Sequence, residues 1–290
     1  MKIKSRSDYI LDAFVYLVMV IVLIITIFPI WYIVMASFSA TDAVSEGKVI
    51  LWVKGFTLES YKTVVKTKNL WTSYGNTIYY SVFGTIINML LTVLCGYAIS
   101  KKWMPGRRVI IIFITLSMWF SPGMMANYIN YRDLGIVNSR LGILLIGAIN
   151  TYNVILMRSF FESIPEQMEE SALLDGANEF QILFKIYLPL STAALMTISL
   201  YYFVGHWNAY FWSMILLQDE KKIPLQVLLK KLIVKMSVME SESANMDYTE
   251  ISRETVVYAT MIVSMLPMLM IYPFVQKFFE KGVMIGAVKG

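Results

Sequence analysis

The sequence predicts an all-α integral membrane protein with six transmembrane helices, and composition and charge distribution both support this fold class. The chain of 290 residues is 57% hydrophobic and only 16% charged, with a mean hydropathy of +0.60. Soluble domains usually contain about a quarter charged residues. Lys, Arg, Asp and Glu are also absent from six long windows of the sequence. A helix that crosses a bilayer needs roughly 17–25 apolar residues, so each window predicts one span.

The first window differs from a secretory signal peptide in length. Its apolar core runs from Phe14 to Ala36, which exceeds the roughly 7–15 apolar residues of a signal sequence. We therefore expect an uncleaved first span inside a membrane domain over 13–285. The six predicted spans cover residues 13–36, 75–100, 108–128, 136–157, 188–216 and 255–276.

Basic residues beside the first three spans predict the orientation. The segment 1–6 (MKIKSR) precedes span one, and the short link 101–108 between spans two and three contains four basic residues. Short loops rich in Lys and Arg remain in the cytoplasm. Both termini are therefore expected inside, with 1–12 as a cytoplasmic N-terminus and 219–254 as an extracellular loop.

Several spans contain residues that favour close packing or a break. Gly84 and Gly96 in span two suit close helix contact. The sequence 121–123 (Ser-Pro-Gly) predicts a break near the outer end of span three. Asn150 and Asn153 fall near the middle of span four, where they suit hydrogen bonds between helices or to a ligand.

The outer loop 219–254 contains the segment 223–236, IPLQVLLKKLIVKM. Its Leu and Ile residues recur at intervals of three and four, which is typical of one apolar face of a helix. Pro224 suits the first turn of that helix. The helix is too short and too polar to span, so we expect it at the outer surface.

Residues 163–187 predict a helix–turn–helix on the cytoplasmic side, between spans four and five. Ser163, followed three residues later by Glu166, predicts a capped first helix that ends at Gly176. Asn178 and Gln181 predict the cap of a second helix over 179–187. The residues alone fit either a solvated acidic hairpin or a docking element for a basic partner.

The spacing within this loop resembles the EAA loop of permeases from binding-protein-dependent ABC importers. That motif is E-A-A, three residues, G, nine residues, then I-x-L-P. This chain has Glu170-Ser171-Ala172, three residues, Gly176, nine residues, and 186–189 (Ile-Tyr-Leu-Pro). Its one departure is Ser171, a small residue in place of Ala.

The resemblance implies the permease subunit of a type I ABC importer for oligosaccharides, similar to the second permease of the maltose branch. It also implies a cell-membrane location, a second homologous permease, two ATPase subunits that hold ATP and Mg²⁺, and an extracellular or periplasmic solute-binding protein. No cofactor and no nucleic acid are expected for this chain. The Gly-Lys pair at Gly47 and Lys48 lacks the spacing of a P-loop, so we expect a non-catalytic subunit.

In this family the first helix of the loop inserts into a cleft of the ATPase. The resemblance therefore implies a docking set in which Glu169 and Glu170 pair with basic residues of the partner, while small residues allow close approach. The expected docking residues are Met168, Glu169, Glu170, Ala172, Leu173, Asp175, Gly176 and Ala177.

Two other function classes fit the sequence poorly. Ion-coupled carriers usually keep a charged residue inside a span, whereas the six windows contain none. Intramembrane metalloproteases need more than one His for zinc, and His206 is the single His of the chain. A secondary carrier and an intramembrane enzyme therefore remain the weaker alternatives.

Sugars are bound by aromatic faces and neutral hydrogen-bonding groups. The candidate residues of the substrate path are Trp119, Asn150, Asn153, Tyr202, His206, Asn208 and Tyr210. Tyr202, His206 and Tyr210 share one helix face, although aromatic residues near a span end also form interfacial belts. Arg132 and Arg140 at the outer rim are suited to steering uronates, which leaves neutral and acidic sugars both open.

Overall fold

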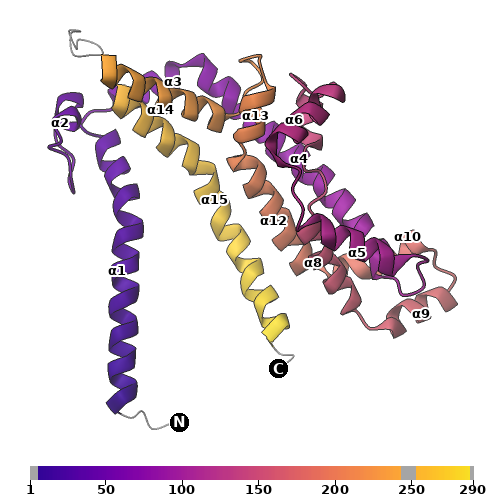
Figure 1. Cartoon of the computed structure of the whole chain (residues 1–290). Helices are drawn as coiled ribbons and strands as arrows, with labels where there is room; N and C mark the ends of the chain where they lie inside the picture. Colours follow the sequence, from indigo (N-terminus) through magenta and orange to yellow (C-terminus); the bar gives the residue numbers. More distant parts are fainter. Residues whose placement is uncertain (1–5, 243–252, 288–290) are drawn as a thin grey trace. The chain divides into compact units, whose positions relative to one another are not determined.

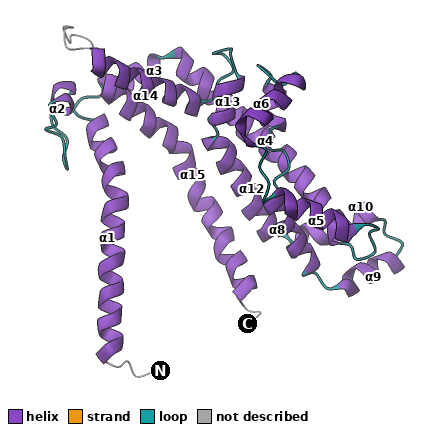
Figure 2. Ribbon diagram, viewed as in Figure 1, coloured by secondary structure: helices purple, strands orange, loops and turns teal. Residues whose placement is uncertain are grey.

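The computed structural model describes residues 6–242 and 253–287, and every regular element in these two ranges is a helix (Figure 2). The all-α class is therefore as predicted. The chain divides into two compact units, which are described separately: Met1–Leu70 with Leu229–Leu266, and Trp71–Leu228 with Pro267–Gly290. Parts of the predicted N-terminus 1–12 and outer loop 219–254 lie outside the described residues.

The first unit begins with the long helix α1 (Arg6–Ser37), followed by α2 (Thr41–Ser45) and α3 (Glu59–Lys66) (Figure 1). Its small core joins Ala36, Val44 and Val49. Most described side chains of α1 are exposed along its length. Exposed apolar helix faces of this kind are stable in lipid rather than in water.

Within residues 6–242 and 253–287, three helices are long and apolar enough to cross a membrane. They are Tyr9–Ser37 within α1, Lys68–Ser100, which is α4, and Glu254–Pro273 within α15 (Arg253–Ala287). These helices correspond to predicted spans one, two and six. A bent pair of helices in the region of span five adds a fourth candidate.

Predicted span three is divided into α5 (Arg107–Ser117) and α6 (Gly123–Asp133). The break was expected at 121–123, and it contains Pro122, which lacks a backbone N–H, and Gly123 at a φ of 81°.

Predicted span four is also divided, and the expectation of one helix over 136–157 was wrong. The structure has α7 (Arg140–Leu145) and α8 (Thr151–Glu162). Gly147 has a φ of 69° between them, and the side chain of Asn150 accepts a hydrogen bond from the backbone N of Asn153 at 3.1 Å. Asn150 therefore caps α8 instead of lying inside a continuous helix.

The predicted helix–turn–helix is present as α9 (Glu166–Leu174) and α10 (Glu179–Ile182). A π-helical stretch, Leu183–Tyr187, continues α10 directly into the short α11 (Leu188–Leu190). Figure 1 places α9 and α10 at one end of the second unit, beyond α8.

Predicted span five is not one straight helix over 188–216. The pair Glu179–Leu190 and Thr192–Asn208 is bent by 84°, and the second member of that pair is α12. The chain leaves helical geometry again at Ala209, before α13 (Phe211–Leu216). Pro189 lacks an N–H donor and Ser191 has a non-helical φ of −99° and ψ of 18°, which accounts for the bend.

The helix predicted from the segment 223–236 is present as α14 (Leu225–Glu242), and Pro224 lies directly before it and not in its first turn. In the second unit, α8 packs against α12 and α5. The main core of that unit forms where α4, α8, the π-helical stretch and α12 meet, and its largest buried members include Phe161, Met157 and Ile198.

Candidate functional site

The loop between α8 and α10 has the local signals that end and start helices. Gly176 has a φ of 79°, the left-handed conformation that ends α9. Asn178 and Gln181 form a reciprocal capping box with α10, with hydrogen bonds of 2.9 Å in both directions. Both features were predicted.

Ser163 does not cap α9, so that prediction was wrong. Its hydroxyl donates back to the carbonyl of Phe160 at 2.7 Å, because Ser163 terminates α8. Helix α9 begins three residues later, after Pro165, without a side-chain cap.

One face of α9 is turned into the protein. Glu169 is partly buried, and Ala172 and Ala177 pack against the main core of the second unit. The sequence assigned these three residues to close contact with a partner. In the structure they are used for contact within the chain.

The opposite face of α9 is open. Met168, Glu170, Leu173 and Asp175 are exposed, and the side chain of Leu174 is 89% exposed. A Cβ built on Gly176 would meet no atom within 4 Å. An exposed Leu pair beside acidic groups is a suitable contact for a partner with both apolar and basic residues.

Basic residues of the link that follows α4 pair with acidic residues of the loop. The Lys101 Nζ lies 2.7 Å from the Glu169 Oε2, and both side chains are largely buried. Lys102 pairs with Glu166 at the surface. The link between spans two and three is therefore in direct contact with α9.

A second pairing joins the end of α8 to the same link. The Glu162 carboxylate forms ion pairs with Arg107 and with Arg158. The Arg158 Nε lies 2.8 Å from the Glu162 Oε1. The Arg107 Nε donates to the Ile99 carbonyl at 2.8 Å, near the end of α4. One arginine thus connects the last turn of α4 with the last turn of α8.

Two tyrosines complete the inner side of the loop. The Tyr187 hydroxyl donates to Glu169 at 2.5 Å, and the Tyr97 hydroxyl donates to Glu179 at 2.6 Å. Burial and the adjacent Glu169 carboxylate raise the pKa of Tyr187. The phenol therefore stays protonated and serves as a donor at neutral pH.

The candidate substrate-path residues differ in burial: two are buried, His206 is half-buried, and the other four, including Asn150, are exposed. Tyr202 is buried, shares a hydrogen bond of 2.7 Å with Thr92, and accepts one of 3.3 Å from the backbone N of Asn150. Asn153 is also buried. Tyr202 and Asn150 are thus brought together, in a contact that joins α4, α8 and α12.

His206 lies one turn further along α12, against Gly84 of α4. A Cβ at Gly84 would approach the imidazole to 2.5 Å, so this contact depends on glycine. Trp119, Asn208 and Tyr210 are exposed. The Asn208 side chain donates to the Val204 carbonyl of its own helix at 3.0 Å.

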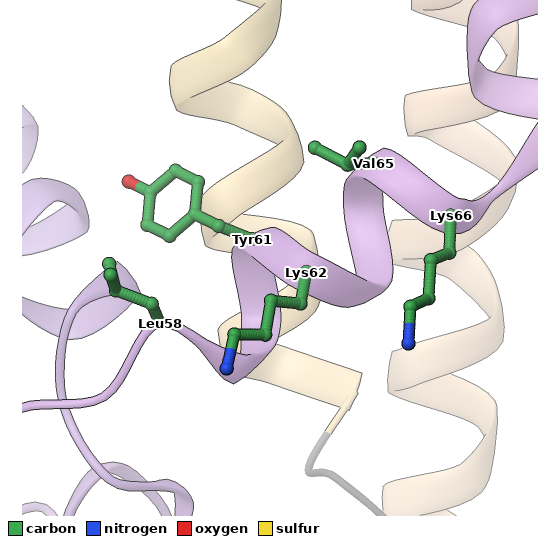
Figure 3. A pocket seen from close by; sticks show the side chains of 5 residues that line it. All are labelled: Leu58, Tyr61, Lys62, Val65 and Lys66. Carbon is green, nitrogen blue, oxygen red and sulfur yellow. The ribbon is translucent and has the colours of Figure 1, made fainter.

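In the first unit, a shallow hollow of about 330 Å³ lies along α3 (Figure 3). Its lining residues are Leu58, Tyr61, Lys62, Val65 and Lys66. None of them is a candidate site residue, and the hollow has few polar groups that converge on a ligand.

The sequence reading missed four residues of the loop region: Lys101, Tyr97, Tyr187 and Leu174. The pairing of Lys101 could have been predicted, since a basic link and an acidic loop were both expected in the cytoplasm. Leu174 could also have been identified from the sequence, because a Leu pair is unusual in an otherwise acidic segment. The tyrosines could not, because aromatic residues near a helix end have many roles.

The family model of binding-protein-dependent transport system inner membrane components matches residues 1–285. The chain belongs to this family. The polygalacturonan/rhamnogalacturonan transport system permease protein YtcP of Bacillus subtilis is 35% identical to this permease over 280 residues, which cover 96% of this chain and 98% of that protein. The permease is thus a non-catalytic membrane subunit of a sugar ABC importer.

Two solved structures resemble this permease. A chain of a bacterial ABC transporter involved in the import of the acidic polysaccharide alginate is 43% identical, with a TM-score of 0.89 over 96% of this chain and 100% of that one. A chain of a bacterial alginate ABC transporter in complex with a periplasmic protein bound to alginate pentasaccharide has 17% identity and a TM-score of 0.63, over 93% of both chains. The second likeness concerns the fold alone.

Proposed function

We propose that this permease crosses the membrane six times with both termini in the cytoplasm, and that the open face of α9 docks on an ATPase subunit. The observation that carries the docking role is the open face itself. Leu174, Leu173 and Glu170 are presented to solvent by a helix whose other face is anchored to the protein. A solvated hairpin needs neither the exposed Leu pair nor the anchor.

The docking set that we propose differs from the one that the resemblance implied, because it adds Leu174 and leaves out Glu169, Ala172 and Ala177. It comprises Met168, Glu170, Leu173, Leu174 and Asp175, with Gly176 allowing close approach. Glu169, Ala172 and Ala177 support this set from inside the chain. The ATPase face that fits would offer an apolar hollow with basic residues at its edge.

The partners follow from the family. A binding protein delivers the solute, in keeping with the family's description as binding-protein-dependent. A second permease completes the path, and the apolar residues of α1 that are exposed from Tyr9 to Trp31 offer a surface to it or to lipid. Two ATPase subunits hold ATP and Mg²⁺ and close on hydrolysable nucleotide.

The proposed substrate is an acidic oligosaccharide. The two relatives with the higher identities are named for polygalacturonan/rhamnogalacturonan and for the acidic polysaccharide alginate. Arg140 is consistent with this class. It is exposed and donates to Asn76 and to the Lys221 carbonyl, both uncharged acceptors, so its charge is available to a uronate.

Docking is tested by co-purification of the ATPase with the wild-type permease and with Glu170→Arg plus Gly176→Leu. Glu59→Arg on α3 is the matched control, because it reverses an exposed charge on the face proposed to be extracellular. We expect the ATPase with wild type and control and its loss from the double variant. Retention by a folded double variant would contradict the docking face.

The substrate class is tested by uptake of a galacturonate trisaccharide and of a maltose trisaccharide into proteoliposomes that contain the full transporter and its binding protein. We expect uptake of the first only. Uptake of the neutral sugar alone would overturn the acidic class but leave the docking role unaffected.

A further inference from the structure

We propose that Lys101 is a positioning residue that fastens the coupling helix α9 to the end of α4, so that both move as one body when the ATPase moves α9. This inference rests on the proposed docking of α9. It concerns the inner face of that helix, which the ATPase does not touch.

The surroundings of Lys101 are unusual for a lysine. Its side chain is 5% exposed, whereas lysines are almost never fully buried unless they are paired. The Nζ lies 4.2 Å from the ring centroid of Tyr97 and 4.1 Å from that of Tyr187. The ammonium is held by the Glu169 carboxylate and by two aromatic faces.

Each wall of this enclosure comes from a different element. Tyr97 belongs to α4, Glu169 to α9 and Tyr187 to the π-helical stretch that leads into α11. The rings of Tyr97 and Tyr187 also contact each other edge to face, at 5.0 Å between centroids. Lys101 therefore connects three elements at a single buried atom.

Without this connection, the contacts of α9 with the rest of the second unit would be its two short connections, 163–165 and 175–178, the packing of Ala172 and Ala177, the Tyr187–Glu169 hydrogen bond and the exposed Lys102–Glu166 pair. Two alanines offer little apolar area to resist a pull. A buried ion pair resists separation strongly, since removal of either partner leaves an unpaired charge in a low dielectric.

The neighbouring pair supplies an internal control. Lys102 and Glu166 form an ion pair one residue along the link, but their side chains are 76% and 62% exposed. Exposed pairs contribute little to the position of a helix. The inference therefore predicts that only the buried pair holds α9.

The experiment measures a spin-label distance within the complete transporter in nanodiscs. Cys95, the single cysteine of the chain, is first replaced by Ser. Labels are then attached at Leu90→Cys on α4 and Gln167→Cys on α9, two exposed positions outside the docking set. Distances are recorded without nucleotide and with ATP, Mg²⁺ and vanadate, in wild type, Lys101→Met and Lys102→Met.

In wild type and Lys102→Met we expect one narrow distance that is the same in both nucleotide states. In Lys101→Met we expect the width to at least double and the mean to depend on vanadate, while the ATPase still co-purifies. If the variant keeps the narrow, unchanged distance, the positioning role is overturned. If wild type retains no ATPase, the proposed docking fails, and the width without nucleotide still decides whether Lys101 holds α9.

Glu169→Gln provides a second route if Lys101→Met fails to fold. It keeps the size of the side chain and removes the charge that faces Lys101. The same broadening is expected. A narrow distance in this variant would overturn the inference, because the carboxylate is the charged wall of the enclosure.

Discussion

The two ends of α4 are fastened by different chemistry. At the C-terminal end, Tyr97 donates a hydrogen bond to Glu179, and Lys101, which directly follows the helix, pairs with Glu169 of α9. Near the N-terminal end, Asn76, Thr77 and Tyr80 form hydrogen bonds with the backbone of residues 221–225, where the chain enters α14.

The N-terminal contacts are short and uncharged. The Asn76 side chain donates to the Lys221 and Ile223 carbonyls at 2.8 and 3.0 Å. The Tyr80 hydroxyl donates to the Lys222 carbonyl at 2.8 Å, and the Thr77 hydroxyl accepts from the Leu225 N–H at 2.8 Å. These bonds fix the path of a segment that would otherwise leave backbone groups unsatisfied.

The difference separates two tasks. Hydrogen bonds to backbone groups depend on the fold of the segment and little on its side chains, so they fix a shape. A buried ion pair is costly to open, so it resists a pull directed along it. The end of α4 next to α9 has the buried Lys101–Glu169 ion pair, which is the kind of contact that resists displacement of α9 by the ATPase.

The largest expected effect comes from removing the buried charge. Lys101→Met leaves the partly buried Glu169 carboxylate without its cationic partner, although Tyr187 still donates to it, and we expect the free energy of unfolding to fall by about 3–5 kcal/mol. Denaturant-induced unfolding of the detergent-solubilised permease measures this loss. Lys102→Met, at the exposed pair, is expected to cost about 0–1 kcal/mol. Equal losses in the two variants would remove the distinction between the pairs.

At the other end of α4, Asn76→Ala removes donors from two carbonyls and an acceptor from Arg140. We expect a loss of about 1–3 kcal/mol, because buried acceptors are left without partners. The same unfolding experiment measures it. Asn69→Ala, at an exposed position of the same helix, is expected to stay within about 0.5 kcal/mol. A cost for Asn76→Ala as large as for Lys101→Met would make the two ends energetically alike.

The middle of α4 tests whether the helix is held along its length. Gly84→Ala places a methyl group against the His206 ring. Overpacking of about 2 kcal/mol, offset by about 1 kcal/mol of helix propensity, leaves a net loss of about 1 kcal/mol. Gly75→Ala, where no atom lies within 4 Å, is expected to raise thermal stability instead. If thermal stability rises in both Gly84→Ala and Gly75→Ala, His206 does not pack against α4.

The smallest expected effect is at the cap of α10. Asn178→Ala removes the bond to the Gln181 N–H, for an expected cost of about 0.5–1 kcal/mol. Thermal unfolding monitored by circular dichroism measures it. Ser163→Ala is the contrast, because its hydroxyl bonds only the end of α8, and a larger effect there would restore the predicted cap of α9.

The sequence predicted local features of the loop better than its orientation. The left-handed Gly176 and the capping box of Asn178 and Gln181 depend on residues close together in the chain, so the local sequence predicts them. Which face of α9 turns inward depends on Lys101, far away in sequence. The contacts that Glu169 and Ala172 make within their own chain were therefore not predicted, and their assignment to a partner stays a prediction.

Continuous spans were predicted where the chain contains breaks, for a related reason. The segment around Gly147 is as apolar as the helices beside it, so hydropathy gives no sign of the interruption. The break at 121–123 was predicted because Pro and Gly occur together there. Among the candidate path residues, the contact of Tyr202 with Asn150 required the positions of α8 and α12, which no local pattern contains.

The π-helical stretch Leu183–Tyr187 has a consequence for how this gene can vary. A π-turn holds one residue more than an α-turn, so deleting a residue here would restore α-helical register and rotate all that follows by about 100°. Tyr187 would then turn away from Glu169, and the helix after it would present a different side to α8. We expect natural and engineered variants to accept many substitutions on the exposed side of this stretch but no change in its length.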